Sequence, residues 1–98
     1  MAKLTPIHPG EVLAEDFMKP LMLSANALAR RLGVPANRIS AIVNGRRHIT
    51  PDTALRLERA LGSSAEFWLN LQARYDLETT RDQIDTKELS AIKLIEAA

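Results

Sequence analysis

The sequence predicts an all-α fold, in which one domain of five short helices is followed by a short C-terminal extension. Three observations support this prediction. Hydrophobic residues make up 46% of the 98 residues and aromatic residues only 4%, so we expect a core of Leu, Ile, Val and Ala side chains packed between helices. Long alternations of β-branched residues, which are typical of strands, are absent. Prolines and glycines stand where helices are expected to begin and end.

The first three helices follow from these start and stop signals. One is expected from about Pro9 to Met18, because proline suits a first helical turn and its apolar residues share one face. The next two are expected over 25–32 and 36–44, since Ser24 can cap the former and a glycine follows each of them. The positions expected to face inward are Val12, Leu13, Phe17, Leu28, Leu32, Ile39, Ile42 and Val43.

Two further helices and a less regular tail complete the prediction. The fourth helix is expected from Pro51 to about Leu61, because a capping hydroxyl, a proline and an acid stand together at Thr50–Asp52. Its core candidates are Ala54, Leu55 and Leu57. The Ser63–Glu66 segment has capping-box spacing and opens a fifth helix to about residue 76. We expect residues 1–77 to form the domain and 78–98 the extension, whose short apolar run fits either a helix or a strand.

Composition excludes several classes of protein. Without cysteine there is no disulfide or thiolate metal site, and two histidines give zinc little support. No apolar run is long enough to span a membrane and no secretory signal is present, so we expect a soluble, cytoplasmic protein. Paired carboxylates, a catalytic triad and a phosphate-binding glycine loop are all lacking, so no cofactor and no enzymatic activity are expected. We expect His8 to cap the first helix rather than to act with Glu11 as an acid–base pair.

Charge is distributed unevenly along the chain. The net charge is only +1, yet the stretch ALARRLGVPANRISAIVNGRR, Ala27 to Arg47, contains five arginines and no acid. The connection LGVP between the second and third helices is too short for an antiparallel hairpin and suits a helix-turn-helix. If this motif binds DNA, an acid in this stretch would be repelled by the phosphates. The pattern therefore indicates a DNA-binding surface.

In a helix-turn-helix the second helix of the motif lies in the major groove with its N-terminal residues towards base edges. Asparagine can pair with adenine, arginine with guanine, and alanine can contact the thymine methyl group. The expected base contacts are Ala36, Asn37, Arg38, Ser40 and Ala41. The expected phosphate contacts, which set register and salt dependence, are Asn44, Arg46, Arg47 and Arg30.

Three segments of the chain resemble one protein family over roughly residues 5–77. They are IHPGEVLAEDFMKP, LSANALARRLGVPANRISAIVNGRRHITPDTALRLERALG and SAEFWLNLQARYDL, and they are similar to the HigA-type antitoxins of the phage-repressor-like helix-turn-helix superfamily. The resemblance implies a homodimer that binds an inverted-repeat operator in double-stranded DNA and represses its own operon. It also implies that the protein neutralises a RelE-like ribonuclease toxin of a type II toxin–antitoxin module.

The aromatic and polar residues of the fifth helix are candidates for the homodimer interface, because a domain of this size leaves some of its apolar residues exposed. They are Phe67, Trp68, Asn70, Leu71, Arg74 and Tyr75. Two alternatives remain open at this point. One is a stand-alone helix-turn-helix transcription regulator without a toxin, and the other is a protein-interaction module that binds an acidic partner.

Overall fold

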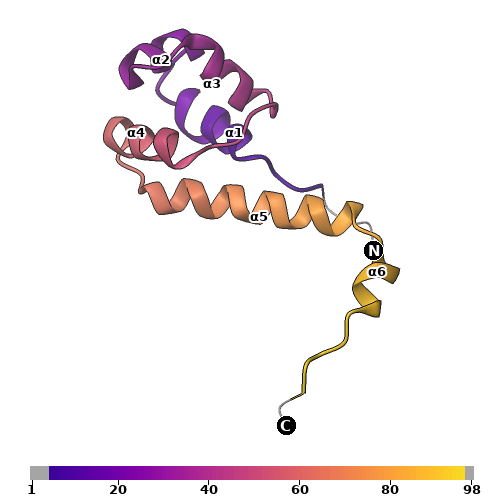
Figure 1. Cartoon of the computed structure of the whole chain (residues 1–98). Coiled ribbons are helices and arrows are strands. Elements are labelled where there is room, and N and C mark those ends of the chain that lie inside the picture. Colours follow the sequence, from indigo (N-terminus) through magenta and orange to yellow (C-terminus); the bar gives the residue numbers. More distant parts are fainter. Residues whose placement is uncertain (1–4, 97–98) are drawn as a thin grey trace.

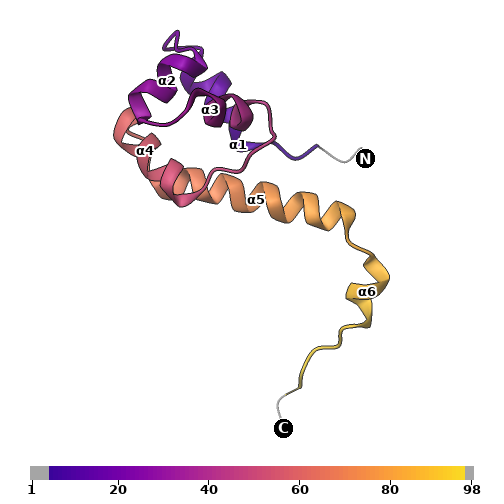
Figure 2. The ribbon, with the colours of Figure 1, turned by 45° about the horizontal axis from the view of Figure 1, so that its top comes forward.

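Helices account for most of the chain in the computed structural model, which describes residues 5–96. Between these residues the structure contains helices and loops but no strand, as the sequence predicts. Figures 1 and 2 show α1, α2 and α3 stacked over α4 and the first half of α5. The helical elements are α1 (Pro9–Val12), its continuation η1 (Leu13–Met18), α2 (Ala25–Leu32), α3 (Ala36–Val43), α4 (Pro51–Leu61), α5 (Ala65–Gln83) and α6 (Thr86–Ala91).

The helix expected from Pro9 to Met18 has these bounds, but its second half is a wider π-helical turn. There, the backbone N–H of Lys19 donates to the carbonyl of Ala14, five residues earlier, over 3.0 Å. Helices α2, α3 and α4 begin and end at or within one residue of the expected positions.

Local capping explains these boundaries. The hydroxyl of Ser24 accepts from the N–H of Ala27, and the hydroxyl of Thr50 accepts from that of Thr53. The capping box expected at Ser63–Glu66 is wrong. Ser64 caps α5 by accepting from the N–H of Phe67, while the Ser63 hydroxyl accepts from the indole of Trp68 over 2.8 Å.

The core lies where α1, η1, α2, α3, α4 and α5 meet. Leu28, Ile39 and Ile42 are buried as predicted. Leu55 was expected in the core, but it is 56% exposed. The buried stripe of α4 follows the helical period through Ala54 and its neighbours, and Leu55 lies about 100° further around the axis.

Helix α5 is longer than the sequence suggested. It was expected to end at about residue 76 but runs without a break to Gln83, because no glycine or proline interrupts the chain after Gly62. An ion pair of 2.8 Å between Arg74 and Glu78 crosses the expected end of the helix. The expected boundary between residues 77 and 78 therefore falls inside α5.

The tail beyond α5 projects away from the other helices (Figures 1 and 2). Of the two conformations that remained open for it, the structure shows the short helix α6, capped by Asp85, followed by an extended segment. None of the residues of α6 is buried. Ile92, Leu94 and Ile95 are 73–93% exposed.

Candidate nucleic-acid interface

The turn between α2 and α3 has the geometry of a helix-turn-helix. Gly33 ends α2 with a φ of 72°, a left-handed conformation that glycine adopts without steric cost. The next N–H, that of Val34, donates to the carbonyl of Ala29 over 3.0 Å. Ala29 is itself buried, and its small side chain allows the two helices to approach closely. The chain then enters α3 directly after Pro35.

One face of α3 is anchored and the other is open. Ile39 and Ile42 are completely buried in the core. On the opposite side Asn37 is exposed, and Ser40 and Ala41 are half-buried. Ala36 was also expected to face outward, but it packs against the core, because it lies one turn before Ile39 and two turns before Val43 on the same side of the helix. The Ser40 hydroxyl donates to the carbonyl of Ala36 over 3.2 Å. The outward face of α3 is therefore flat and built from small side chains around one amide, which allows the helix backbone to approach a groove closely.

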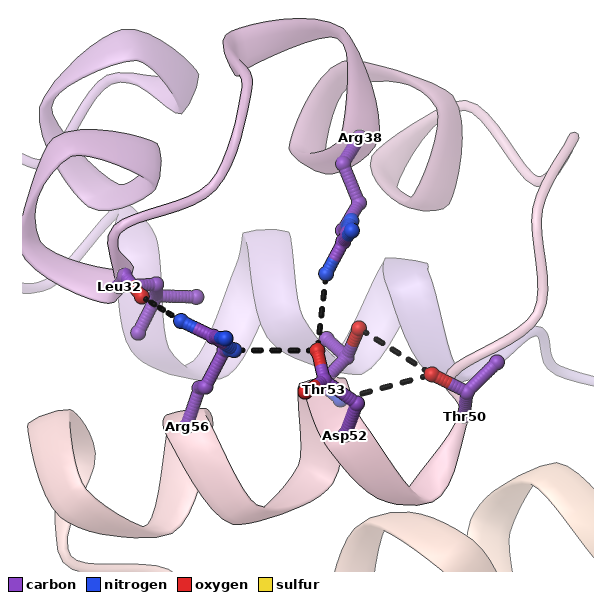
Figure 3. A network of polar contacts seen from close by, with 6 residues as sticks. All are labelled: Leu32, Arg38, Thr50, Asp52, Thr53 and Arg56. Carbon is purple, nitrogen blue, oxygen red and sulfur yellow. Dashed lines mark hydrogen bonds and ion pairs between the residues drawn. The ribbon is translucent and has the colours of Figure 1, made fainter.

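Arg38 differs from the expectation. It was predicted to point outward with Asn37, but its guanidinium points towards the first turn of α4, as Figure 3 shows. Its Nη1 donates to Oδ2 of Asp52 over 2.9 Å, and its side chain is only 24% exposed. The reason is that α4 begins beside the first turn of α3 and brings a carboxylate within reach. The sequence alone gives no sign of this contact, because loop 44–50 separates the two helices.

Asp52 is shared by two arginines. Its Oδ2 also accepts from Nε of Arg56 over 3.0 Å, and Nη1 of Arg56 donates to the carbonyl of Leu32 over 2.7 Å (Figure 3). The hydrogen bond from Arg56, together with that from Arg38, lowers the pKa of the Asp52 carboxyl. The network thus connects the end of α2, the start of α3 and the start of α4.

The residues expected to contact phosphate lie at the surface. Asn44, Arg46 and Arg47 are exposed in and beside the loop after α3, and Arg30 is exposed on α2. Gln72 on α5 anchors the end of this loop, because its buried side-chain oxygen accepts a hydrogen bond from the N–H of Ile49 over 2.8 Å. Gln72 was not among the residues predicted from the sequence.

The N-terminus of α1 supports α3 from the other side. His8 caps α1 as expected, since its Nδ1 accepts from the N–H of Gly10 over 2.9 Å. Gly10 was also not singled out, although it lies against α3 so closely that a Cβ there would be 1.8 Å from the carbonyl oxygen of Ile42. The His–Pro–Gly segment therefore serves a close helix contact rather than chemistry.

We expect stability to rise with pH in the range where His8 titrates. Burial, together with the nearby His48, lowers the pKa of His8 from its ordinary value of 6.5 against an opposing effect of Asp76. Protonation would also remove the Nδ1 acceptor of the cap. Because the folded-state pKa lies below the unfolded one, this stability is fully present above about pH 6.5 and is lost as pH falls through the folded pKa. Urea unfolding at pH 5, 6 and 7 measures it.

The control for this prediction is His8→Asn, because asparagine keeps a capping acceptor but does not titrate. The variant should lose part of the pH dependence between pH 5 and 7. An identical pH dependence in both proteins would contradict the assignment to His8.

Of the candidate dimer-interface residues of α5, one is buried and the others are accessible. Trp68 was expected at a dimer surface, but it is 0% exposed and packs against Phe17 with ring centroids 5.0 Å apart, so it has no surface to offer a partner. An indole is the largest side chain available to fill the space between η1 and α5. The remaining candidates are exposed or half-buried along α5, and they are Phe67, Asn70, Leu71, Arg74 and Tyr75.

Comparisons with known proteins agree with this geometry. The helix-turn-helix family model matches residues 15–68. Virulence-associated protein I of Dichelobacter nodosus is 53% identical over 76 residues, which cover 78% of this chain and 70% of that protein. Antitoxin HigA-1 of Vibrio cholerae is 40% identical over 81 residues, covering 83% and 76%. The structure of the Pseudomonas aeruginosa antitoxin HigA with the higBA promoter is similar with a TM-score of 0.86 at 41% identity, covering 90% of this chain and 96% of that one.

The fold and the matched segment define the class of helix-turn-helix regulators. Within this class, the chain belongs to the HigA-type antitoxin family. The family consists of DNA-binding regulators and not of enzymes. None of the helices between residues 5 and 96 combines the length and the apolar character needed to cross a membrane.

Proposed function

We propose that this protein is a sequence-specific DNA-binding antitoxin that represses its own operon. The observation that carries the proposal is the open face of α3, which is held rigidly on the core and bordered by exposed arginines. Arg30, Arg46 and Arg47 are all exposed there, and the stretch that contains them has no acid. The operator DNA bound by related antitoxins supports the same function.

In this proposal α3 enters the major groove. Asn37, on the exposed side of its first turn, pairs with an adenine, and the methyl group of Ala41 meets a thymine. Ser40 lies on the same face. The residues that grip phosphate are Asn44, Arg46, Arg47 and Arg30, which fix the register of the protein on the duplex.

The protein acts as a homodimer in this proposal. Two copies related by a two-fold axis present their α3 helices about 34 Å apart, one turn of B-DNA, to the halves of an inverted repeat. The face of α5 that remains after Trp68 is excluded supplies the contact, with Phe67, Leu71 and Tyr75 as its apolar part. Asn70 and Arg74 lie on the same face, one turn and two turns after Phe67.

We also propose that the protein neutralises a RelE-like ribonuclease toxin. The support is the name of its relatives, since one is an antitoxin and another is an addiction module antidote protein of the HigA family from Coxiella burnetii. Co-purification with a toxin encoded beside it tests this part, and a stand-alone regulator would purify alone.

Selection of bound duplexes from a random DNA pool at about 150 mM salt tests the DNA-binding function. Enrichment of an inverted repeat with half-sites one helical turn apart would support a dimeric operator-binding protein. Weak binding that is indifferent to sequence would contradict it, and would instead favour a module whose arginines hold an acidic protein.

Replacing Arg46 by alanine should weaken binding to every duplex similarly. A phosphate contact carries no direct sequence information, and its loss should reduce the slope of log K against log salt by about 0.9 for each protomer. Titrations of the selected and a scrambled duplex over a salt series measure both effects. Arg81→Ala is the matched control, because Arg81 is exposed near the end of α5. A loss confined to the selected duplex would show that Arg46 reads bases.

A further inference from the structure

We propose that Asp52 is a positioning residue that determines specificity, because it holds Arg38 away from the phosphates of unrelated DNA. This inference rests on the proposed DNA-binding function. It assigns different roles to the arginines. Arg46 and Arg47, in the loop after α3, contact the phosphates of any duplex, whereas Arg38 is kept from such contacts by Asp52.

The geometry around Arg38 supports the withholding. A side chain in the first turn of the groove-binding helix would normally be available to DNA. Here the guanidinium of Arg38 turns to α4 and meets Asp52 at 2.9 Å, and its buried Nε has no partner among the described residues. Figure 3 shows the side chain directed along the line from α3 to α4.

Asp52 is itself held in place. Arg56 bonds the same carboxylate oxygen over 3.0 Å and is fixed at its other end to the carbonyl of Leu32. The carboxylate therefore cannot follow Arg38 towards DNA without breaking its bond to Arg56. A neutral acceptor would hold Arg38 more weakly, since it would keep a hydrogen bond but lose the attraction between two opposite charges.

The negative charge of Asp52 also acts on DNA directly. Its side chain is 57% exposed next to the first turn of α3, the turn that approaches the base edges. There it cancels one positive charge and repels phosphate, which lowers the affinity that does not depend on sequence. A purely structural brace would instead affect all duplexes equally, so the two roles differ in what they do to the specificity ratio.

Asp52→Asn tests the proposal, because asparagine keeps an acceptor oxygen for Arg56 and Arg38 but removes the charge. Binding of the selected operator and of a scrambled duplex is titrated over a salt series. We expect the scrambled duplex to bind at least about threefold tighter, with a salt slope steeper by about 0.9 for each protomer, as for one added phosphate contact. Operator affinity should rise less, so the specificity ratio falls.

The double variant with Arg38→Met isolates the cause. In the Arg38→Met background Asp52→Asn should change binding of the scrambled duplex less than it does alone, because no arginine is left to release. Equal weakening of both duplexes by Asp52→Asn would overturn the proposal and leave a structural brace. If the unsubstituted protein selects no duplex, the proposed function fails instead, and the two failures are distinguishable.

A second measurement applies if Asp52→Asn does not fold. Arg38→Met alone should weaken binding of the scrambled duplex clearly less than Arg46→Ala does, because a withheld arginine contributes no phosphate contact and its loss only leaves the Asp52 carboxylate with one arginine partner fewer. A loss as large as that of Arg46→Ala would overturn the proposal.

Discussion

Replacing Gly10 by alanine is expected to destabilise the protein by about 3 kcal/mol and to displace α3, because overpacking a tight contact forces the backbone to move. The added Cβ would lie 1.8 Å from the carbonyl oxygen of Ile42 and 2.6 Å from its carbonyl carbon. These are backbone atoms of the helix that we propose to enter the major groove. In an ordinary helix the same substitution stabilises by about 1 kcal/mol, so the contact with Ile42 reverses the usual sign.

Urea unfolding measures the loss of stability, and operator titration measures the displacement of α3. The control is Gly62→Ala, where nothing lies within 4 Å of the added Cβ. Gly62 has a φ of 81°, so its substitution should cost only the strain of a left-handed residue, about 1–2 kcal/mol. A Gly10→Ala protein as stable as the unsubstituted one would show that α1 and α3 can move apart freely.

The helix boundaries predicted from the sequence were right where their determinants are local. The bounds of α2 and α4 follow from Ser24, Gly33, Thr50 and Gly62, because caps and left-handed glycines act on their immediate neighbours. The end of α5 was missed for the same reason, since no local signal marks Leu77 and the helix continues until the chain turns at Ile84.

The contacts that position the candidate interface were missed because they join segments far apart in the chain. Gly10 meets Ile42 and Arg38 meets Asp52 through tertiary packing, for which a single sequence carries no periodic or capping signal. Arg30, Arg31, Arg46 and Arg47 of the arginine run are exposed, but the outward orientation predicted for Arg38 was wrong.

Replacing Gln72 by leucine is expected to destabilise the protein by about 1–3 kcal/mol, because a buried backbone N–H loses its acceptor. Gln72 is buried on α5, and it connects the N–H of Ile49 at 2.8 Å to the carboxylate of Asp76 at 2.9 Å. Leucine has a similar size and fills the space, so the loss is mainly that of hydrogen bonds. Gln83→Leu, at an exposed position of the same helix, should change stability by less than about 0.5 kcal/mol.

The consequence of the Gln72 substitution for DNA binding follows from the place of Ile49. Its N–H lies at the end of the loop that carries Arg46 and Arg47, so its release lets the loop move relative to α3. More conformational entropy is then lost when the loop is ordered against the phosphates. The affinity should therefore fall for selected and scrambled duplexes alike. Hydrogen exchange of the Ile49 amide reports the release directly. If this amide stays protected in Gln72→Leu, the loop is held by other contacts, and the loss of affinity should not occur.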